Sequence, residues 1–124
     1  MDLSRSYAQN EVSGMKESEL ESRALIRTAS GLNLIKEHWE ERKGELEEAL
    51  EKNRKLWAII ASAMSEEDCP QPAEIKRNIL SLAVFVFKRT VDVMANPAPE
   101  KLNALISINM NIAKGLSGDG ADAQ

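Results

Sequence analysis

The sequence predicts an all-α fold, a compact bundle of about four main helices in one domain. Three observations lead to this prediction. The 124-residue chain is rich in Leu, Ala, Ile, Glu and Lys and contains only 4% aromatic residues, a composition that favours helix over sheet. Apolar residues recur at helical spacing, and no stretch alternates as a half-buried strand would. Pairs of prolines separate the last three apolar stretches from one another.

The N-terminal end differs in composition from the rest of the chain. Residues 1–14 are polar and end in Ser-Gly, so we expect a flexible arm ahead of a single helical domain over 15–117. The arm lacks the apolar core of a secretory signal. No apolar run approaches the ~20 residues that a membrane-spanning helix needs. We therefore expect a cytoplasmic protein without membrane insertion.

The first predicted helix starts near residue 17 and carries apolar residues at helical spacing from Leu20 to Trp39. The segment that follows, EHWEERKGELEE, is strongly charged and includes Gly44, which disfavours a helix interior. We therefore predict a break near residues 40–45. An apolar spacing of seven that continues through the segment leaves one long, unbroken helix as the alternative.

Prolines mark the boundaries of the remaining helices. The second predicted helix contains ALEKNRKLWAIIASAM and stops before Pro70 and Pro72. The third, over about 72–95, contains ILSLAVFVF and is apolar on nearly every side, which is typical of a central helix in a bundle. Pro99 opens the fourth helix. Residues 118–124 are expected to form a disordered tail.

Two asparagines occupy positions where the helical spacing predicts burial. Asn53 lies between Leu50 and Trp57 on the apolar stripe of the second helix, and Asn109 has the corresponding place in the fourth. An unpaired buried amide costs roughly 1–3 kcal/mol, so each should bond a backbone group or the other asparagine. We predict that the two form a structural polar core that sets helix register, with direct partner contact as the alternative.

The sequence contains no recognisable catalytic, metal-binding or cofactor-binding motif. His38 is the single histidine and lies among charged residues, where a solvent-facing position is expected. The carboxylates between residues 40 and 51 alternate with Lys and Arg, as on a solvated face with ion pairs. Cys69 is the single cysteine, so no intramolecular disulfide can form. We predict a non-enzymatic protein without cofactor or metal.

Three motifs give the chain a resemblance to a known family. In order, they are Asn-Arg-x-Leu-Trp at residues 53–57, Ser-Leu-x-x-Phe-Val at 81–86, and Ile-Asn at 108–109 followed by Gly-Leu at 115–116. Together with KESELESRALIRTAS near the start, they make the chain resemble the FlaF family of flagellin-biosynthesis regulators over residues 13–117. The chain departs from that pattern at Lys88-Arg89-Thr90, where the family has a basic–His–Thr triplet, and at Met110, where it has arginine.

The resemblance implies a non-enzymatic cytoplasmic factor needed for flagellum assembly. It implies that flagellin is the partner, that the protein supports flagellin production and secretion, and that it acts in opposition to or in concert with the regulator FlbT. A helical bundle is well suited to hold an amphipathic segment of unassembled flagellin in an apolar groove.

The third predicted helix also suggests where such a partner would bind. Its successive apolar residues, from Val84 to Phe87, cover more than the width of one bundle seam. Where the other three helices leave this surface open, we predict a partner-binding groove bordered by Phe87, Arg54 and Trp57, in which Arg54 and Lys88 orient the partner more than they strengthen binding. Coverage of the whole surface by the other three helices is the alternative.

Two other functions remain open as alternatives. One is post-transcriptional control through direct binding of flagellin messenger RNA. The formal charge of −4 and the lack of an aromatic stacking platform argue against direct RNA binding. The other is a helical dimerisation module, in which surplus apolar surface pairs with itself to form a homodimer.

Overall fold

The structure, a computed structural model, describes the backbone of residues 3–117 and the side chains of residues 19–116. All regular elements in this part of the chain are helical, and no strand occurs among them, which confirms the predicted all-α class. The elements are α1 (Leu3–Glu37), the short α2 (Trp39–Arg42), the 3-10 turn η1 (Lys43–Glu45), α3 (Leu46–Ser65), α4 (Ala73–Ala95), the 3-10 turn η2 (Pro99–Lys101) and α5 (Leu102–Ser117).

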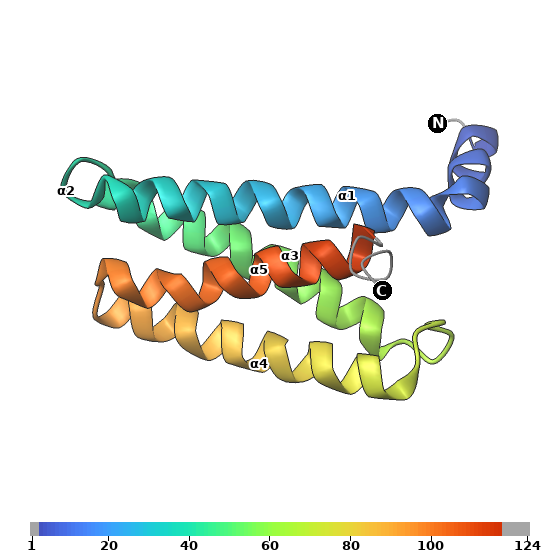
Figure 1. Cartoon of the computed structure of the whole chain (residues 1–124). Coiled ribbons are helices and arrows are strands. Elements are labelled where there is room, and N and C mark those ends of the chain that lie inside the picture. The colour runs from blue at the N-terminus through green and yellow to red at the C-terminus, as the bar shows by residue number, and fades with distance from the viewer. Residues whose placement is uncertain (1–2, 118–124) are drawn as a thin grey trace.

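The four long helices form two closely packed pairs. Figure 1 shows α1 along one edge of the bundle with α5 beside it, and α4 along the opposite edge. Helix α5 packs mainly against α1, and α4 packs mainly against α3. Helix α1 also contacts α3, so the two pairs share one core, whereas α4 and α5 touch only sparingly.

The predicted break after the first helix is confirmed. Helix α1 ends at Glu37, and His38 has the non-helical angles φ −119° and ψ 50°. The chain then turns through α2 and η1, and α3 returns alongside α1. One unbroken helix is therefore ruled out. The charged segment cannot form an apolar seam, so reversing the chain there leaves its ionic side chains in water.

The start of α1 lies earlier than the sequence suggests. The predicted helix begins near residue 17 after an arm over 1–14, whereas the structure continues α1 back to Leu3. The stretch contains no proline, and extending a formed helix costs far less than nucleating a new one. The predicted tail over 118–124 lies outside the described residues.

The prolines limit the helices as predicted. Pro72 is the N-cap of α4, with its carbonyl accepting the amide of Lys76 at 3.0 Å. Pro99 stands at the first position of η2, directly ahead of α5. A proline tolerates these positions because its missing N–H would have no helical partner there.

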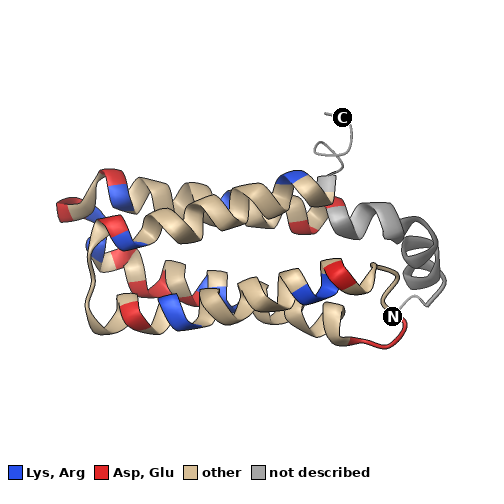
Figure 2. Ribbon diagram, turned by 60° about the horizontal axis from the view of Figure 1, so that its bottom comes forward, with Lys and Arg blue, Asp and Glu red and all other residues tan. Residues whose placement is uncertain are grey.

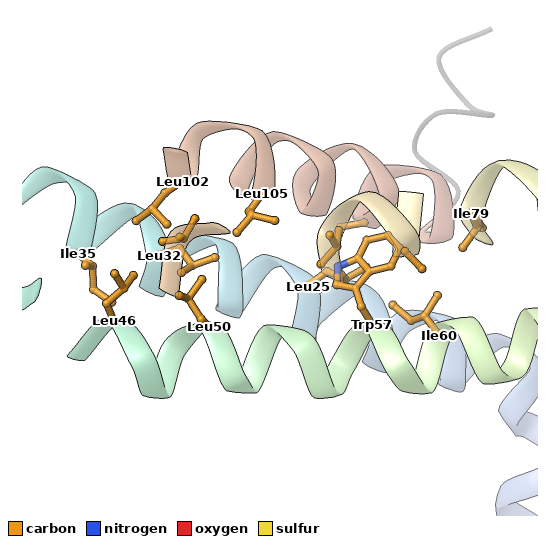
Figure 3. Close-up of a cluster of buried hydrophobic side chains, with 14 of the residues drawn as sticks. Leu25, Leu32, Ile35, Leu46, Leu50, Trp57, Ile60, Ile79, Leu102 and Leu105 are labelled. Atoms are coloured by element: carbon orange, nitrogen blue, oxygen red, sulfur yellow. The ribbon is translucent and has the colours of Figure 1, made fainter. Parts of the chain in front are cut away.

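The core lies where one apolar stripe from each long helix converges. Figure 3 shows Leu32, Leu50 and Leu105 from three different helices pointing toward one another. All three are fully buried, as is Trp57. Full burial of a side chain of this size contributes about 1.5–3 kcal/mol.

Helix α4 was expected to be a central helix, and the structure corrects this expectation. It lies at one edge of the bundle and buries a single stripe, with Val86 and Val93 among its members. Val84 and Phe85 remain exposed on its surface. With four helices in two pairs, no helix is surrounded on all sides, so a helix that is apolar all round must leave apolar surface open.

Candidate functional site

An open apolar groove runs between α4 and α5. It consists of two adjoining hollows of ≈ 680 Å³ and ≈ 390 Å³ that share Asn78 and Leu82. We call it the α4/α5 groove. The first hollow is lined by Asn78, Ser81, Leu82, Phe85, Ala104, Ser107 and Ile108. The second is lined by Gln71, Ile75, Asn78, Ile79, Leu82, Asn111, Ile112, Gly115 and Leu116.

The groove follows from the way α5 is packed. Leu102 and Leu105 face the core, while Ile108 and Ile112 lie on the neighbouring side of the helix, toward α4. Because α4 and α5 scarcely touch along their lengths, these side chains stay only half-buried. Gly115 lines the second hollow at an open position, where a Cβ would meet no atom within 4 Å.

The groove differs from the other described hollows in carrying no charged side chain. The hollow between α1 and α3 near the turn is lined by Arg27, Arg42, Glu45, Glu48 and Lys52 among others. Two further hollows include the carboxylates of Glu21 and Glu66 in one case and of Glu51 in the other. Figure 2 shows charged residues near both ends of the bundle and long uncharged stretches of helix between them.

One end of the groove is held by Arg89. Its guanidinium lies over the Phe85 ring, 5.1 Å from the centroid, and Nη1 donates to the carbonyl of Lys101 at 3.2 Å. Lys101 in turn forms an ion pair with Asp92 at 3.1 Å and donates to the carbonyl of Asn96. These contacts tie the end of α4 to the start of α5 and so set the spacing between the two walls.

The residues predicted to bind a partner do not line this groove. Trp57 is 0% exposed, so the prediction that it borders an open groove is wrong. Its indole packs in the core and donates a hydrogen bond to Asn109. A tryptophan on the core stripe buries far more area when it faces the other helices than when it lines a surface groove.

The other three predicted residues also lie outside the groove, Phe87 and Lys88 on α4 and Arg54 on α3. Phe87 is half-buried against the core, and Lys88 is exposed. Arg54 forms an i,i+3 ion pair with Glu51, and the hydrogen bond from its guanidinium lowers the pKa of that carboxyl. Phe85, two residues before Phe87 and about 200° away around the helix, lines the groove instead.

The two seam asparagines meet in the centre of the bundle. Both are 0% exposed, and Asn109 Nδ2 donates to Asn53 Oδ1 at 2.7 Å. Asn109 also donates to Thr28 Oγ1 at 2.8 Å and accepts the Trp57 indole N–H at 2.8 Å. Asn109 thereby ties α5 to α1 and α3. The register-setting role of the pair stays a prediction.

Two features of the buried polar cluster around Asn109 could not be predicted from the sequence. One is the participation of Thr28, and the other is an amide nitrogen of Asn53 without a hydrogen-bond partner in the described structure. Thr28 joins it from α1, donating to the Leu25 carbonyl while accepting from Asn109. Asn53 Nδ2 is buried and has no hydrogen-bond partner among the described residues. Threonine is common on helix surfaces, so nothing in its spacing distinguished Thr28 from its exposed neighbours.

The positions that depart from the FlaF pattern fall in different environments. In the triplet, Lys88 is exposed, Arg89 holds the end of the groove, and Thr90 is buried with its hydroxyl bonded to the Val86 carbonyl at 2.7 Å. Met110 is exposed and belongs to neither hollow of the groove.

Among the described residues, no group of three or more His, Cys, Asp or Glu side chains could hold a metal ion. In the same part of the chain, no helix has both the length and the apolar character needed to cross a bilayer. Whatever the groove binds, its lining residues offer apolar contact and neutral hydrogen bonds.

Comparison with known proteins identifies the family. A family model described as flagellar protein FlaF matches residues 3–116, almost the full length of the chain. No curated protein and no solved structure matches the chain. The family match confirms the resemblance carried by the three motifs, two of which contribute residues to the groove and one of which contains Asn53 and Trp57. The chain belongs to the FlaF family of flagellar proteins.

Proposed function

We propose that the protein is a non-enzymatic flagellar assembly factor that binds a helical segment of unassembled flagellin in the α4/α5 groove. By doing so in the cytoplasm it supports flagellin production and secretion. Membership of the FlaF family supports the flagellar role. The observation that carries the binding mode is the α4/α5 groove itself, which is open, largely apolar and lined by no charged side chain among the described residues.

The dimensions of the groove suit a helix. Its lining residues on α4 extend from Ile75 to Phe85, about 15 Å at 1.5 Å per residue. A partner helix of about three turns would lie along this length with its apolar ridge against Leu82 and Ile108. Burial of that ridge would supply affinity at roughly 25 cal/mol per Å² before the costs of association.

The same burial explains how binding could support secretion. A flagellin subunit whose apolar helical surface is covered by the groove cannot use that surface to join another subunit. A reversible groove complex would therefore keep flagellin unassembled until export. FlbT, the other regulator that the family resemblance implies, would act on the same flagellin pool.

The test is a titration of purified flagellin with the protein and with two variants of α4. Phe85→Asp places a charge in the groove and is expected to weaken binding at least about tenfold. Val91→Asp is the control, because Val91 is 67% exposed on the same helix and outside both hollows. Groove binding should also give a negative heat-capacity change and survive higher salt.

Two results would contradict the proposal. One is flagellin affinity that does not respond to Phe85→Asp. The other is the absence of a flagellin complex alongside an RNA complex that weakens steeply as salt rises, which would favour direct action on messenger RNA.

A further inference from the structure

We propose that the α4/α5 groove selects its partner by excluding charge: it takes an amphipathic helix whose docked face carries only apolar and uncharged polar side chains. The identity of the natural partner as flagellin rests on the proposed function above. The selection rule rests on the lining of the groove alone.

The first step is the chemistry of the lining. The polar members of the groove are Gln71, Asn78, Ser81, Ser107 and Asn111, and each is an uncharged group that can both donate and accept hydrogen bonds. A partner helix carrying Ser, Asn or Gln beside its apolar ridge can donate hydrogen bonds to these groups and accept hydrogen bonds from them. The walls of the groove are therefore complementary to a partner helix whose apolar ridge is bordered by uncharged polar side chains.

The second step is what happens to a charged side chain on the docked face. A Lys or Glu there would lose water against Leu82, Phe85 and Ile108, with no ion of opposite sign in the lining. The cation at the end of the groove, Arg89, is already held by the Phe85 ring and the Lys101 carbonyl. An unpaired, desolvated charge is strongly disfavoured, so charged helices are rejected.

The third step is the contrast within the molecule. The hollows between α1 and α3 and between α3 and α4 contain charged side chains, so they would tolerate or attract ionic partners. Helix α5 carries a single charged residue, Lys114, in its sixteen residues, and that residue is outside the groove. Absence of charge is thus specific to this face of the described structure.

The experiment introduces one charge into the groove without disturbing the core. Ser81 and Ser107 line the same hollow from opposite walls and are both exposed, so Ser81→Lys and Ser107→Lys should fold normally. Ser30→Lys is the matched control, because Ser30 is an exposed serine of α1 outside the groove. Circular dichroism checks that all three variants remain folded.

The probes are purified flagellin and a synthetic helical peptide of about 15 residues, enough to fill the groove. The peptide has Leu and Ala on the docked face with Ser and Asn beside them, and charges only on the opposite face. A second version of the peptide carries one Glu in place of a docked-face Ser. Affinities are measured by calorimetry at low and high salt.

We expect Ser81→Lys and Ser107→Lys to reverse the preference of the wild-type protein for the neutral peptide over the Glu peptide. The wild-type protein and the Ser30→Lys control bind the neutral peptide at least about tenfold more tightly than the Glu peptide. Ser81→Lys and Ser107→Lys lose affinity for the neutral peptide by about the same factor and recover affinity for the Glu peptide. The recovered binding weakens with salt, whereas wild-type binding does not.

The experiment can refute the selection rule and the proposed function independently of each other. If the peptides show this pattern but flagellin does not bind, the selection rule stands and the proposed function is wrong. If flagellin binds and the Ser81→Lys and Ser107→Lys variants bind it as tightly as Ser30→Lys does, the selection rule is wrong. Failure of the neutral peptide to bind the wild-type protein also overturns the rule.

Discussion

At the scale of single residues, Asn109 holds the centre of the molecule together. It is fully buried and bonds three other side chains, those of Thr28, Asn53 and Trp57. Asn53 contributes less, because it accepts one bond from Asn109 while its own Nδ2 has no partner in the described structure. The two asparagines occupy equivalent positions in the sequence pattern, but we expect Asn109 to contribute more to the free energy of unfolding than Asn53.

This inequality predicts different outcomes for the same substitution. Asn109→Leu leaves the Trp57 indole N–H and the Asn53 oxygen buried without partners, so it should lower the free energy of unfolding by about 2–4 kcal/mol. Asn53→Leu also removes an unsatisfied donor, and should change stability by less than about 1 kcal/mol or raise it. Urea unfolding followed by circular dichroism compares the two. A larger loss for Asn53→Leu than for Asn109→Leu would contradict the assignment.

Arg89 allows a second prediction at the residue scale. Arg89→Ala removes the contact over Phe85 and the hydrogen bond to Lys101, and should destabilise the protein by about 1 kcal/mol. Lys88→Ala, at the exposed neighbouring position, is the control and should stay within about 0.5 kcal/mol of wild type. Thermal unfolding measures both. Equal effects of the two variants would show that Arg89 does not hold the turn.

At the scale of elements, the helix boundaries depend on helix-breaking residues and on the extension of helices already formed, more than on the helix propensity of each residue. Prolines start α4 and η2, and the charged turn after Glu37 reverses the chain. Gly31, by contrast, lies inside α1 without ending it. Its backbone takes the helical form that any residue adopts, and a Cβ there would meet no atom within 4 Å.

Gly31→Ala should therefore stabilise the protein. Alanine restricts the unfolded chain and favours helix, and the added methyl group meets no obstacle, so the free energy of unfolding should rise by about 0.5–1 kcal/mol. A higher melting temperature in a calorimetric scan is the expected result. A lower one would contradict the open space that the structure shows around a Cβ at residue 31.

At the scale of the whole molecule, the pairing of helices decides which surfaces stay open. Helices α1 with α5 and α3 with α4 pack closely, and the sparse contact between α4 and α5 leaves the groove. The two phenylalanines of α4 lie on different sides of this arrangement. Phe85 is 38% exposed in the groove, and Phe87 packs against the shared core.

Introducing the same charge at these two sites should separate binding from stability. Phe87→Asp buries a carboxylate against the core and should lower the free energy of unfolding by about 3 kcal/mol or more. Phe85→Asp should cost less than about 1 kcal/mol of stability while it impairs binding in the groove. Denaturant midpoints of the two variants provide the comparison. The reverse order of stability would contradict the placement of the two rings.

By itself, the sequence determined the helical class, the helix boundaries at the prolines, the reversal near residues 40–45 and the burial of Asn53 and Asn109. These features are local, because apolar spacing, breakers and caps act within a few residues of one another. The FlaF resemblance was likewise contained in short motifs, and the family match extends it to residues 3–116.

Only the tertiary structure decided which apolar residues of α4 are covered, and hence that Phe85 rather than Phe87 and Trp57 lines the groove. Periodicity gives the angle of a side chain around its own helix, but not which neighbouring helix stands at that angle. That choice is settled by the pairing of α1 with α5 and of α3 with α4, through contacts between residues far apart in the chain. The same pairing brings Thr28 to Asn109 across eighty-one positions, a distance over which no local pattern carries information.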